Sequence, residues 1–434
     1  MTTEVTGKLA RVLSGMRPTG RLHIGHYFGA LQNWVRLQND PAYECFYFIA
    51  DWHALTSDYA DTSGVAQNTI EIMTDYLAAG LDPAKSVIFQ QSQVPEHAEL
   101  HLLLSMVTPL GWLERVPTYK EALENVKDKD LHNYGFLGYP VLQCADIVIY
   151  SEPGAQLFVP VGEDQVSHVE TSREIVRRFR GFYDFRISEA KLTGFLQSNL
   201  DKRNEMPGFL GRVLKDAFSA STFGPGQIAN FVRGVDGALR VHRNVQRAGL
   251  ENFLESYPEA TDFIEFQETL TEPGVMLTTT PRIPGLDGRK MSKSYGNAIT
   301  LSESDADIRT KTRVMVTDPA RKRRTDPGNP DVCPVYDWHK LFSSPATLEW
   351  AAQGCRSAGI GCIECKAKMA DHLIEWITPV RTRRVEYEKN PKRVLEILDA
   401  GSKKARLVAQ GTMERVREAV FGWEKKRSEM AKGD

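Results

Sequence analysis

The stretch RVLSGMRPTGRLHIGHYFGAL, residues 11–31, decides the fold of this chain. It opens with a short apolar run of strand length, residues 11–16, and closes in a helical pattern that continues to residue 38. The loop between them, residues 17–26, holds glycines and two histidines three residues apart. A strand that passes through such a loop into a helix indicates a βαβ unit.

The same alternation of strand and helix continues to about residue 180. Its apolar strands predict an α/β fold, a Rossmann-like doubly wound parallel sheet with helices on both faces. Ligands of such sheets bind beyond the carboxyl ends of the strands, so residues 17–26 are expected at the ligand crevice. The further strand patterns span residues 44–50, 86–91 and 156–162, and the helical patterns span residues 27–38, 65–79, 98–115 and 141–150.

The remaining chain changes character twice. Residues 183–268 combine short apolar runs with scattered glycines and do not repeat the earlier pattern, which indicates an inserted subdomain. After PRIPGLDGRKMSKSYGN (281–297) the chain is more charged and has apolar residues at helical spacing. The predicted divisions are residues 1–182 and 269–315 for a Rossmann-like domain in two parts, 183–268 for the inserted subdomain and 316–434 for an α-helical carboxyl-terminal domain.

The composition is typical of a globular protein. With 434 residues, of which 41% are hydrophobic and 25% charged, the chain is long enough for two or three domains. It has no run of about 18 to 20 apolar residues, and its amino terminus lacks the plan of a secretory signal, so we expect a cytoplasmic protein without membrane contact. A net charge of −2 argues against nucleic-acid binding by bulk electrostatics but leaves RNA open through local basic patches.

His23, Gly25 and His26 stand at the expected start of the first helix. Ring N–H groups and helix-start amides there can donate to phosphate oxygens, and Gly25 leaves room for a base or ribose against the backbone. The structural alternative is that the histidines cap the helix and Gly25 permits packing. The isolated motif does not decide between the two.

A second motif, KMSKS, occupies residues 290–294. Lys290 and Lys293 lie on a loop whose flanking glycines allow movement, so the two lysines can close over a pyrophosphate leaving group and neutralise charge as it develops. Taken alone, such a loop is usually a solvated surface turn. The pairing with the histidine motif is what gives it weight.

In this order and on this fold, HIGH and KMSKS resemble the two signatures of class I aminoacyl-tRNA synthetases. The stretches SGMRPTGRLHIGHYFGAL, ADWHALT, GYPVLQCADIVIY and VPVGEDQVSHVETSREI are similar, in sequence and order, to the tryptophanyl-tRNA synthetase family. The resemblance covers residues 11–180 and 275–434. It implies that L-tryptophan is activated with ATP and Mg²⁺ to an enzyme-bound adenylate, that pyrophosphate is released, and that the acyl group passes to the 3′-terminal adenosine of tRNA(Trp). It also implies a homodimer and an anticodon-binding role for the helical domain.

The resemblance assigns substrate contacts to single residues. Asp146 matches the acceptor for the indole N–H, and the apolar residues on both sides of it disfavour a helix-surface carboxylate. Gln165 and Tyr139 match positions near the ammonium group of the substrate. His53 matches one at the edge of the pocket.

Catalytic and ATP-binding roles follow from the same resemblance. Arg17 falls where related chains often have glutamine beside the reacting carboxylate, which leaves its role less defined. Lys120 matches a lysine on a mobile loop near ATP, with a solvated helix lysine as the alternative. The implied phosphate donors are His23, His26, Lys290 and Lys293, and the implied ATP-binding residues are Gly15, Gly25, Gly162, Met291, Ser292 and Ser294.

Four cysteines gather in the predicted helical domain: Cys333, Cys355, Cys362 and Cys365, the last two in C-x-x-C spacing. Such thiolates suit a tetrahedral zinc ion or an iron–sulfur cluster. A subset of tryptophanyl-tRNA synthetases carries a four-iron, four-sulfur cluster on a very similar pattern, and GCRSAGIGCIECK resembles it, so a 4Fe–4S cluster is expected, with Zn²⁺ as the alternative. The other two cysteines lie in apolar stretches of the sequence and are expected in the core.

Other functions remain open at this point. A tyrosine-specific relative would share the fold and both motifs, and a small-molecule nucleotidylyltransferase would not need the helical domain with its cysteines. A non-catalytic RNA-binding paralogue is disfavoured by the intact motifs. The basic runs RKRR (321–324) and KKAR (403–406) are candidate tRNA phosphate contacts or solvated faces.

Overall fold

The computed structural model describes residues 8–125, 130–202, 204–218, 225–234, 236–278 and 283–431. Positions 1–7, which belong to the amino terminus expected to lack a secretory signal, lie outside these residues. Positions 281–282, at the start of the stretch PRIPGLDGRKMSKSYGN, also lie outside them. Within the described ranges, no helix is both long and apolar enough to cross a membrane.

Five parallel strands form the central sheet, in the order β3-β2-β1-β4-β7. The order confirms the predicted doubly wound sheet, because the chain starts in the middle and builds outward to both edges. The sequence did not predict β7, a short strand that begins with proline and continues with glycine. The strands are β1 (Ala10–Met16), β2 (Tyr43–Ile49), β3 (Ser86–Gln90), β4 (Leu157–Val161) and β7 (Pro273–Leu277).

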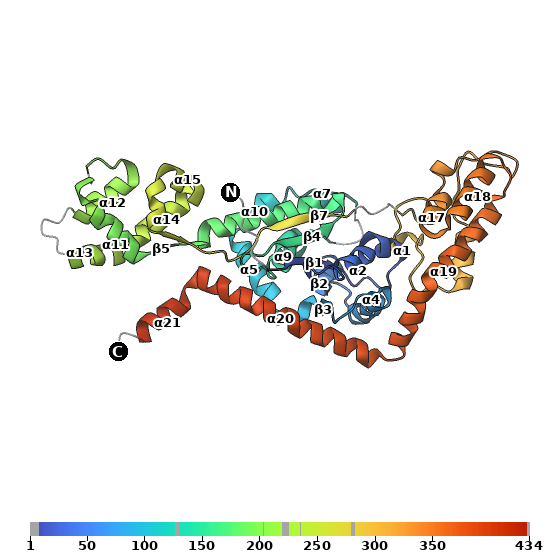
Figure 1. Ribbon diagram of the computed structural model, residues 1–434, viewed down its shortest axis with the longest axis horizontal. Coiled ribbons are helices and arrows are strands. Elements are labelled where there is room, and N and C mark those ends of the chain that lie inside the picture. The colour runs from blue at the N-terminus through green and yellow to red at the C-terminus, as the bar shows by residue number, and fades with distance from the viewer. Residues whose placement is uncertain are drawn as a thin grey trace.

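Helices cover both faces of this sheet (Figure 1). Alternate strand residues supply two separate cores, so that Val12 of β1 lies in one and Leu13 in the other. The helix predicted over residues 98–115 is two helices, since Pro109 interrupts it. The helices of this domain are α1 (Ile24–His26), α2 (Gln32–Leu37), α3 (Asp51–Asp58), α4 (Val65–Ala79), α5 (Glu96–Val107), α6 (Leu110–Leu113), α7 (Pro117–Asn125), α8 (Tyr134–Leu137), α9 (Tyr139–Val148) and α10 (Val166–Tyr183), with a π-helical turn at Tyr27–Leu31.

The insertion lies at one end of the molecule (Figure 1) and has a hydrophobic core of its own. The chain enters it through β5 (Phe185–Ile187) and leaves through β6 (Ile264–Phe266), which pair in antiparallel fashion. The predicted domain boundaries themselves stay a prediction. Its helices are α11 (Glu189–Ser198), α12 (Gly208–Phe218), α13 (Pro225–Arg233), α14 (Ala238–Ala248) and α15 (Leu250–Ser256).

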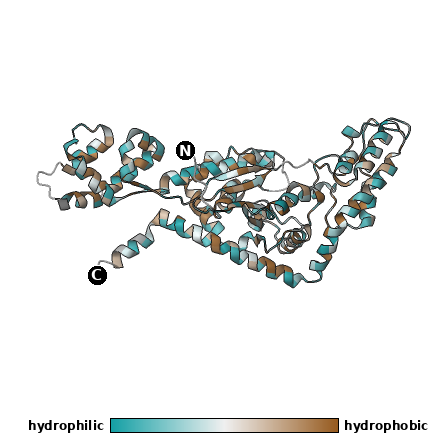
Figure 2. Ribbon diagram, viewed as in Figure 1, coloured by the Kyte–Doolittle hydropathy of each residue, from teal (hydrophilic) through white to brown (hydrophobic). Residues whose placement is uncertain are grey.

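The carboxyl-terminal part is α-helical, as predicted, and α17 to α19 lie at the end opposite the insertion (Figure 1). Figure 2 shows apolar residues concentrated in the strands and alternating with hydrophilic ones along the outer helices. The helices are α16 (Asp305–Arg313), α17 (Pro334–Phe342), α18 (Pro345–Arg356), α19 (Cys362–Glu388), α20 (Pro391–Phe421) and α21 (Trp423–Ala431).

The long helix α20 runs back beneath the sheet and covers its β3 edge (Figure 1). The backbones meet at Gly401, where any side-chain carbon would collide with the carbonyl oxygen of Ile88. Beside it, the Ser402 hydroxyl oxygen accepts the edge N–H of Gln90 at 3.2 Å. Helix α20 thereby protects an edge strand that would otherwise expose unpaired backbone groups.

Substitution Gly401→Ala is expected to push α20 away from β3 and to destabilise the protein by about 1 to 3 kcal/mol. Gly411→Ala is the matched control, because Gly411 lies in the same helix with open space around it. Alanine there should stabilise the helix by about 0.5 to 1 kcal/mol. Urea denaturation midpoints measure both effects, and equal midpoints for the two variants would contradict the close packing.

Candidate active site

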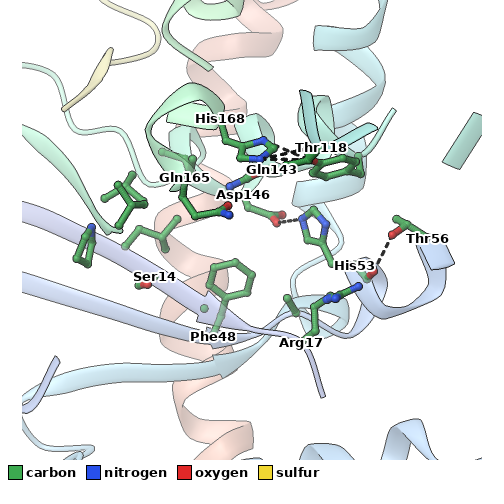
Figure 3. A pocket seen from close by; sticks show the side chains of 18 of the residues that line it. Ser14, Arg17, Phe48, His53, Thr56, Thr118, Gln143, Asp146, Gln165 and His168 are labelled. Carbon is green, nitrogen blue, oxygen red and sulfur yellow. Dashed lines mark hydrogen bonds and ion pairs between the residues drawn. The ribbon is translucent and has the colours of Figure 1, made fainter. Parts of the chain in front are cut away.

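A cavity of about 500 Å³ opens at the carboxyl ends of β1, β2 and β4, where the sequence predicted the ligand crevice. Figure 3 shows its side chains converging from the strands and from the helices above them. It is lined by seven residues singled out in the sequence, Gly15, Arg17, His53, Tyr139, Asp146, Gly162 and Gln165, and by residues that were not, including Phe48, Thr56, Thr118, Gln143 and His168.

Asp146 on α9 is the buried charge of this cavity, with 1% of its surface exposed. Its carboxylate accepts from His97 Nδ1 at 2.6 Å, from His53 Nε2 at 2.8 Å and from Gln91 Nε2, which is 2.8 Å from both oxygens. Burial, the largest influence, raises the pKa of this carboxyl, but the interactions with His53 and His97 outweigh it and lower the pKa to about 2. Asp146 is therefore ionised and fully hydrogen-bonded.

The three donors differ in access. His97 and Gln91 are fully buried, and His97 Nε2 contacts the Tyr150 hydroxyl at 2.8 Å, which fixes the ring from its other side. The His53 side chain keeps 12% exposure and lines the cavity. A ligand N–H that approaches Asp146 from the cavity must therefore displace or share the bond with His53.

Further polar groups of the cavity converge on Tyr139, whose ring centroid lies 6.4 Å from that of His53. Its hydroxyl lies 2.5 Å from Thr118 Oγ1 and 3.2 Å from His168 Nδ1. Burial raises the pKa of Tyr139, so the phenol stays neutral and can donate. Gln165 lies at the amino-terminal end of α10 next to this group (Figure 3).

Arg17 lies at the cavity rim, exposed, with Nη1 3.3 Å from Ser57 Oγ. Below it, the Phe48 ring fills the space beside Gly15, where a side-chain carbon would come within 2.6 Å of the ring. Gly15 is therefore required by the packing of the cavity floor. Lys120 is exposed on α7 and does not line the cavity.

His23 and His26 cap α1 reciprocally, as the structural alternative required. His23 Nδ1 accepts the His26 backbone N–H, and His26 Nδ1 accepts that of His23, both at 3.3 Å, with the rings stacked at 3.6 Å. Because both Nδ1 atoms accept, both rings carry their proton on Nε2. Burial, followed by nearby positive charge, lowers the pKa of His23 to about 4 and of His26 to about 3, so both are neutral donors.

Gly25 and the lysine loop complete this group. A side chain on Gly25 would come within 2.9 Å of His23 Nδ1, so glycine permits the cap, while the predicted contact with ATP stays a prediction. Lys293 donates to the Thr19 carbonyl at 2.5 Å, and burial lowers its pKa. The structure thus brings Lys293 to the two histidines, whereas Lys290 is exposed.

Asn297 organises the lysine loop and was missed in the sequence. It is 3% exposed, its Oδ1 accepts the Ser292 N–H at 2.7 Å, and its Nδ2 donates to Asp287 at 2.7 Å. Ser292 and Ser294 share a hydrogen bond, and Met291 is buried. The asparagine after the glycine of SYGN was the available signal, since such residues often close turns.

The two motifs are joined by backbone hydrogen bonds. Ile24 N–H donates to the Ile299 carbonyl at 3.0 Å, and Leu301 N–H donates to the Leu22 carbonyl at 2.8 Å. His23 and Thr300 form the antiparallel bridge between them. The segment after the lysine loop is thus paired directly with the segment that carries the histidines.

The four cysteines lie where α17, α18 and α19 meet, and they interact electrostatically. Burial and then the other three cysteines raise the pKa of Cys365 to about 12. Among the residues that the structure describes, however, no group of three or more His, Cys, Asp or Glu side chains is arranged to hold a metal ion. The predicted metal centre is therefore not confirmed.

Two residues of the basic run RKRR, Arg321 and Arg324, contact this cysteine region. Arg321 Nη2 donates to the Ile360 carbonyl at 2.7 Å, and its Nη1 lies 3.8 Å from Cys355 Sγ. Arg324 donates to the carbonyls of Ala358 and Gly359 at 2.9 and 3.2 Å. These two arginines hold the loop before α19, which leaves Lys322 and Arg323 exposed.

The fold and the paired motifs define a class I aminoacyl-tRNA synthetase, and the sequence agrees. It matches the family described as tRNA synthetases class I (W and Y) over residues 6–201 and 227–377, so the chain belongs to that family.

Within the family, the following relatives are tryptophan–tRNA ligases or tryptophanyl-tRNA synthetases by name. The chain is 48% identical to a tryptophan–tRNA ligase of Ralstonia nicotianae, covering 94% of this chain and 98% of the relative. It is 41% identical to a tryptophan–tRNA ligase of Thermotoga maritima over the same shares. The tryptophanyl-tRNA synthetase of Campylobacter jejuni, solved with ADP and tryptophan, superposes with a TM-score of 0.66 at 27% identity, covering 94% of this chain and 99% of that one.

The histidine cap predicts a dependence of stability on pH. The unfolded chain takes up protons on these histidines below about pH 6.5, whereas the folded chain does so only near pH 4 and pH 3, so stability should fall as the pH drops through that window. The control is His23→Asn with His26→Asn, which keeps cap acceptors but does not titrate. Its free energy of unfolding, measured by urea denaturation, should fall less steeply, by up to about 1.4 kcal/mol per pH unit for each histidine. Parallel curves would contradict the cap.

Proposed function

We propose that this chain is a tryptophan–tRNA ligase, which activates L-tryptophan with ATP and transfers it to the 3′-terminal adenosine of tRNA(Trp). The observation that carries the proposal is the ionised, buried Asp146 carboxylate in the cavity at the strand ends. The two tryptophan-specific relatives and the Campylobacter structure support the same substrate.

Asp146 supplies the specificity in this proposal. Indole offers one N–H donor within a large apolar surface, and an analogue without that donor would leave a buried carboxylate unpaired. His53 yields or shares its hydrogen bond when the indole N–H arrives, since it is the donor that faces the cavity. Tyr139 and Gln165 then lie at the wall that suits the substrate ammonium group.

The chemical step needs positioning and charge stabilisation. A tryptophan carboxylate oxygen attacks the α-phosphorus of ATP, the bond to the bridging oxygen breaks, and pyrophosphate leaves. Mg²⁺ bound with ATP would offset part of the phosphate charge. The Nε2–H groups of His23 and His26 are free of partners among the described residues, and they donate to phosphate oxygens as neutral groups. Lys293 follows the leaving group once it releases the Thr19 carbonyl.

The second step transfers the acyl group. A hydroxyl oxygen of the terminal adenosine attacks the carbonyl carbon of the adenylate, and AMP leaves. No covalent bond to the enzyme is needed. The roles of Arg17, Lys120, Lys290 and the remaining ATP-binding residues rest on the family resemblance: Gly15, Gly25, Gly162, Met291, Ser292 and Ser294.

For the cysteines we propose an iron–sulfur cluster held by Cys333, Cys355, Cys362 and Cys365. Four thiols share one partly buried site, and Arg321 beside Cys355 balances negative charge, which fits the all-cysteine donor set of a 4Fe–4S cluster. Zn²⁺ is the alternative, since it takes the same four thiolates. When bound, the cluster would cross-link the starts of α17 and α19 to the end of α18.

A homodimer is part of the proposal. Leu102 and Met106, one helical turn apart on α5, and Leu110 of α6 are 53%, 71% and 59% exposed, and association between copies would bury such apolar side chains. Sedimentation velocity measures the assembly state. The cytoplasmic location stays a prediction.

The activity is tested by ATP–pyrophosphate exchange with each of the twenty amino acids. Exchange that depends on tryptophan alone is the expected result. Exchange with tyrosine instead would identify a tyrosine enzyme, and the absence of exchange from folded protein would contradict an activating enzyme altogether.

Asp146→Asn should weaken tryptophan binding by about 1 to 3 kcal/mol. The Asn amide NH₂ would face donors, His97 and Gln91 among them, in place of a carboxylate oxygen that accepts from them. The measurement is the tryptophan KM in the exchange reaction. Asp51→Asn is the control, because Asp51 is a buried carboxylate that accepts from Ser92 and Gln90 but does not line the cavity. It should leave the tryptophan KM within about twofold. An unchanged KM in Asp146→Asn would remove this assignment.

Protein purified without oxygen should contain about four iron and four sulfide per chain and absorb broadly near about 400 nm. Cys365→Ser should lose both, while Cys144→Ala, a buried cysteine outside the set, should retain them. Zinc without sulfide would favour the alternative metal, and the absence of either metal would refute the centre.

A further inference from the structure

One arginine of the carboxyl-terminal domain is buried inside the catalytic domain. Arg384, near the end of α19, is 2% exposed, and its guanidinium bonds to the carboxylates of Asp75 and Glu71 on α4. Its Nε donates to Glu388 at 3.0 Å. A buried arginine with several carboxylate partners is held in one orientation, since its planar fork cannot rotate without losing a bond.

Asp75 connects Arg384 to the histidine motif by a hydrogen bond to the backbone. It is fully buried, and its second oxygen accepts the backbone N–H of Leu22 at 2.6 Å. Leu22 directly precedes His23. Burial raises the pKa of Asp75 to about 6, and Arg384 is the strongest influence in the opposite direction. Arg384 is therefore the group that keeps a charged acceptor beneath Leu22.

A second contact from α19 reaches the other side of the same pairing. Arg381 donates to the Glu303 carbonyl at 2.8 Å, and the Glu303 carboxylate accepts the Thr300 N–H at 3.1 Å. Thr300 is the residue bridged to His23. Helix α19 is thus linked, through Asp75 and through Glu303, to both backbone segments of this pairing.

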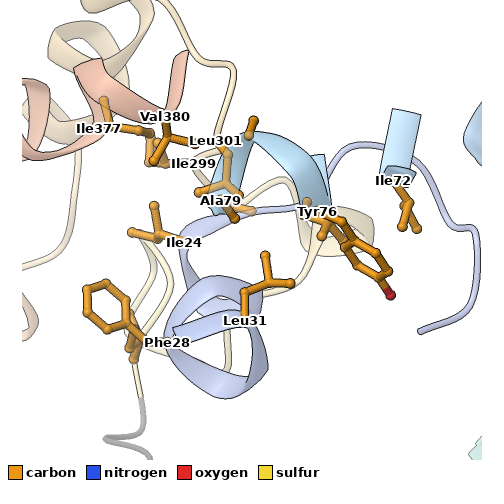
Figure 4. Packing of buried hydrophobic residues seen from close by; sticks show 14 of the residues in the cluster. Ile24, Phe28, Leu31, Ile72, Tyr76, Ala79, Ile299, Leu301, Ile377 and Val380 are labelled. Atoms are coloured by element: carbon orange, nitrogen blue, oxygen red, sulfur yellow. The ribbon is translucent and has the colours of Figure 1, made fainter. Parts of the chain in front are cut away.

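Apolar packing joins the elements that make these contacts in one buried cluster. Figure 4 shows Ile377 and Val380 of α19 against Ile299 and Leu301, with Ile24 beside them and Ala79 of α4 close by. Interiors packed in this way transmit small displacements instead of absorbing them.

We propose that Arg384 is a positioning residue for tryptophan activation, which holds Asp75 and through it the Leu22 N–H, and so fixes the orientation of His23 and His26 toward ATP. This inference rests on the proposed function. It makes the helical domain a structural part of the ATP half of the site and leaves the tryptophan pocket to other residues.

Helix α19 connects the cysteine region to the residues that contact the catalytic domain. Its 27 residues span about 40 Å, and the part from Cys362 at the cysteine region to Arg384 beside the histidine motif spans about 33 Å. A merely structural role for Arg384 would lower stability and damage both substrate sites together. A positioning role affects the ATP half selectively.

The test compares Arg384→Met and Arg384→Lys with Arg383→Met. Arg383 is the matched control, because it is the next residue on α19 and donates to the same helix α4, at the Ala78 carbonyl 2.7 Å away, without contact to Asp75. Exchange kinetics give kcat and the KM for ATP, equilibrium dialysis gives the tryptophan Kd, and thermal melting reports the fold.

Arg384→Met is expected to lower kcat/KM for ATP at least about tenfold with the tryptophan Kd within about twofold, and Arg384→Lys should fall in between. Arg383→Met should resemble the wild type. Asp75→Asn should reproduce the loss, and adding Arg384→Met to it should lower kcat/KM by less than about threefold more, because both act on one path. If Arg384→Met does not fold, Arg384→Lys and Asp75→Asn carry the same comparison.

Wild-type ATP kinetics in Arg384→Lys and Asp75→Asn would overturn the positioning role. So would an equal loss of ATP and tryptophan binding, or effects of Asp75 and Arg384 substitutions that multiply. If the wild-type chain itself shows no tryptophan-dependent exchange, the proposed function fails first and this inference with it.

Discussion

The hydrogen-bonded pairing of residues 22–24 with residues 299–301 is the constraint on which the site depends. It joins a segment near the start of the sheet to one that follows the insertion and β7, so the two motifs are brought together by contacts between distant parts of the chain. The histidines then stand as a neutral, mutually capped pair, and Lys293 reaches them from the other segment. Neither motif has this geometry by itself.

The tryptophan pocket depends on the hydrogen bonds of the Asp146 carboxylate. Asp146 is saturated by donors in the free protein, which stabilises a buried charge that would otherwise be costly. Because His53 alone of these three donors lines the cavity, the carboxylate can exchange one partner for a ligand without being left unpaired. Specificity and stability are thus served by the same group.

Local pattern predicted much of this architecture. Four of the five strands and the crevice position of Asp146, Tyr139, His53 and Gln165 followed from periodicity and motif resemblance, because those signals lie within single stretches. His97, Arg384 and the short strand β7 did not, since their significance comes from partners on distant elements. The role of the basic run RKRR could not be decided from the sequence. In the structure, two of its arginines donate to backbone carbonyls of the loop before α19, and a local sequence pattern does not show these partners.

A crystal structure with tryptophan and a non-hydrolysable ATP analogue would test the central claim most directly, that one site unites the Asp146 pocket with the paired motifs. The account predicts the indole N–H on the Asp146 carboxylate, with the His53 bond lengthened or exchanged, and phosphate oxygens at Nε2 of His23 and His26. An indole bound outside this cavity, or phosphates away from the two histidines, would contradict it.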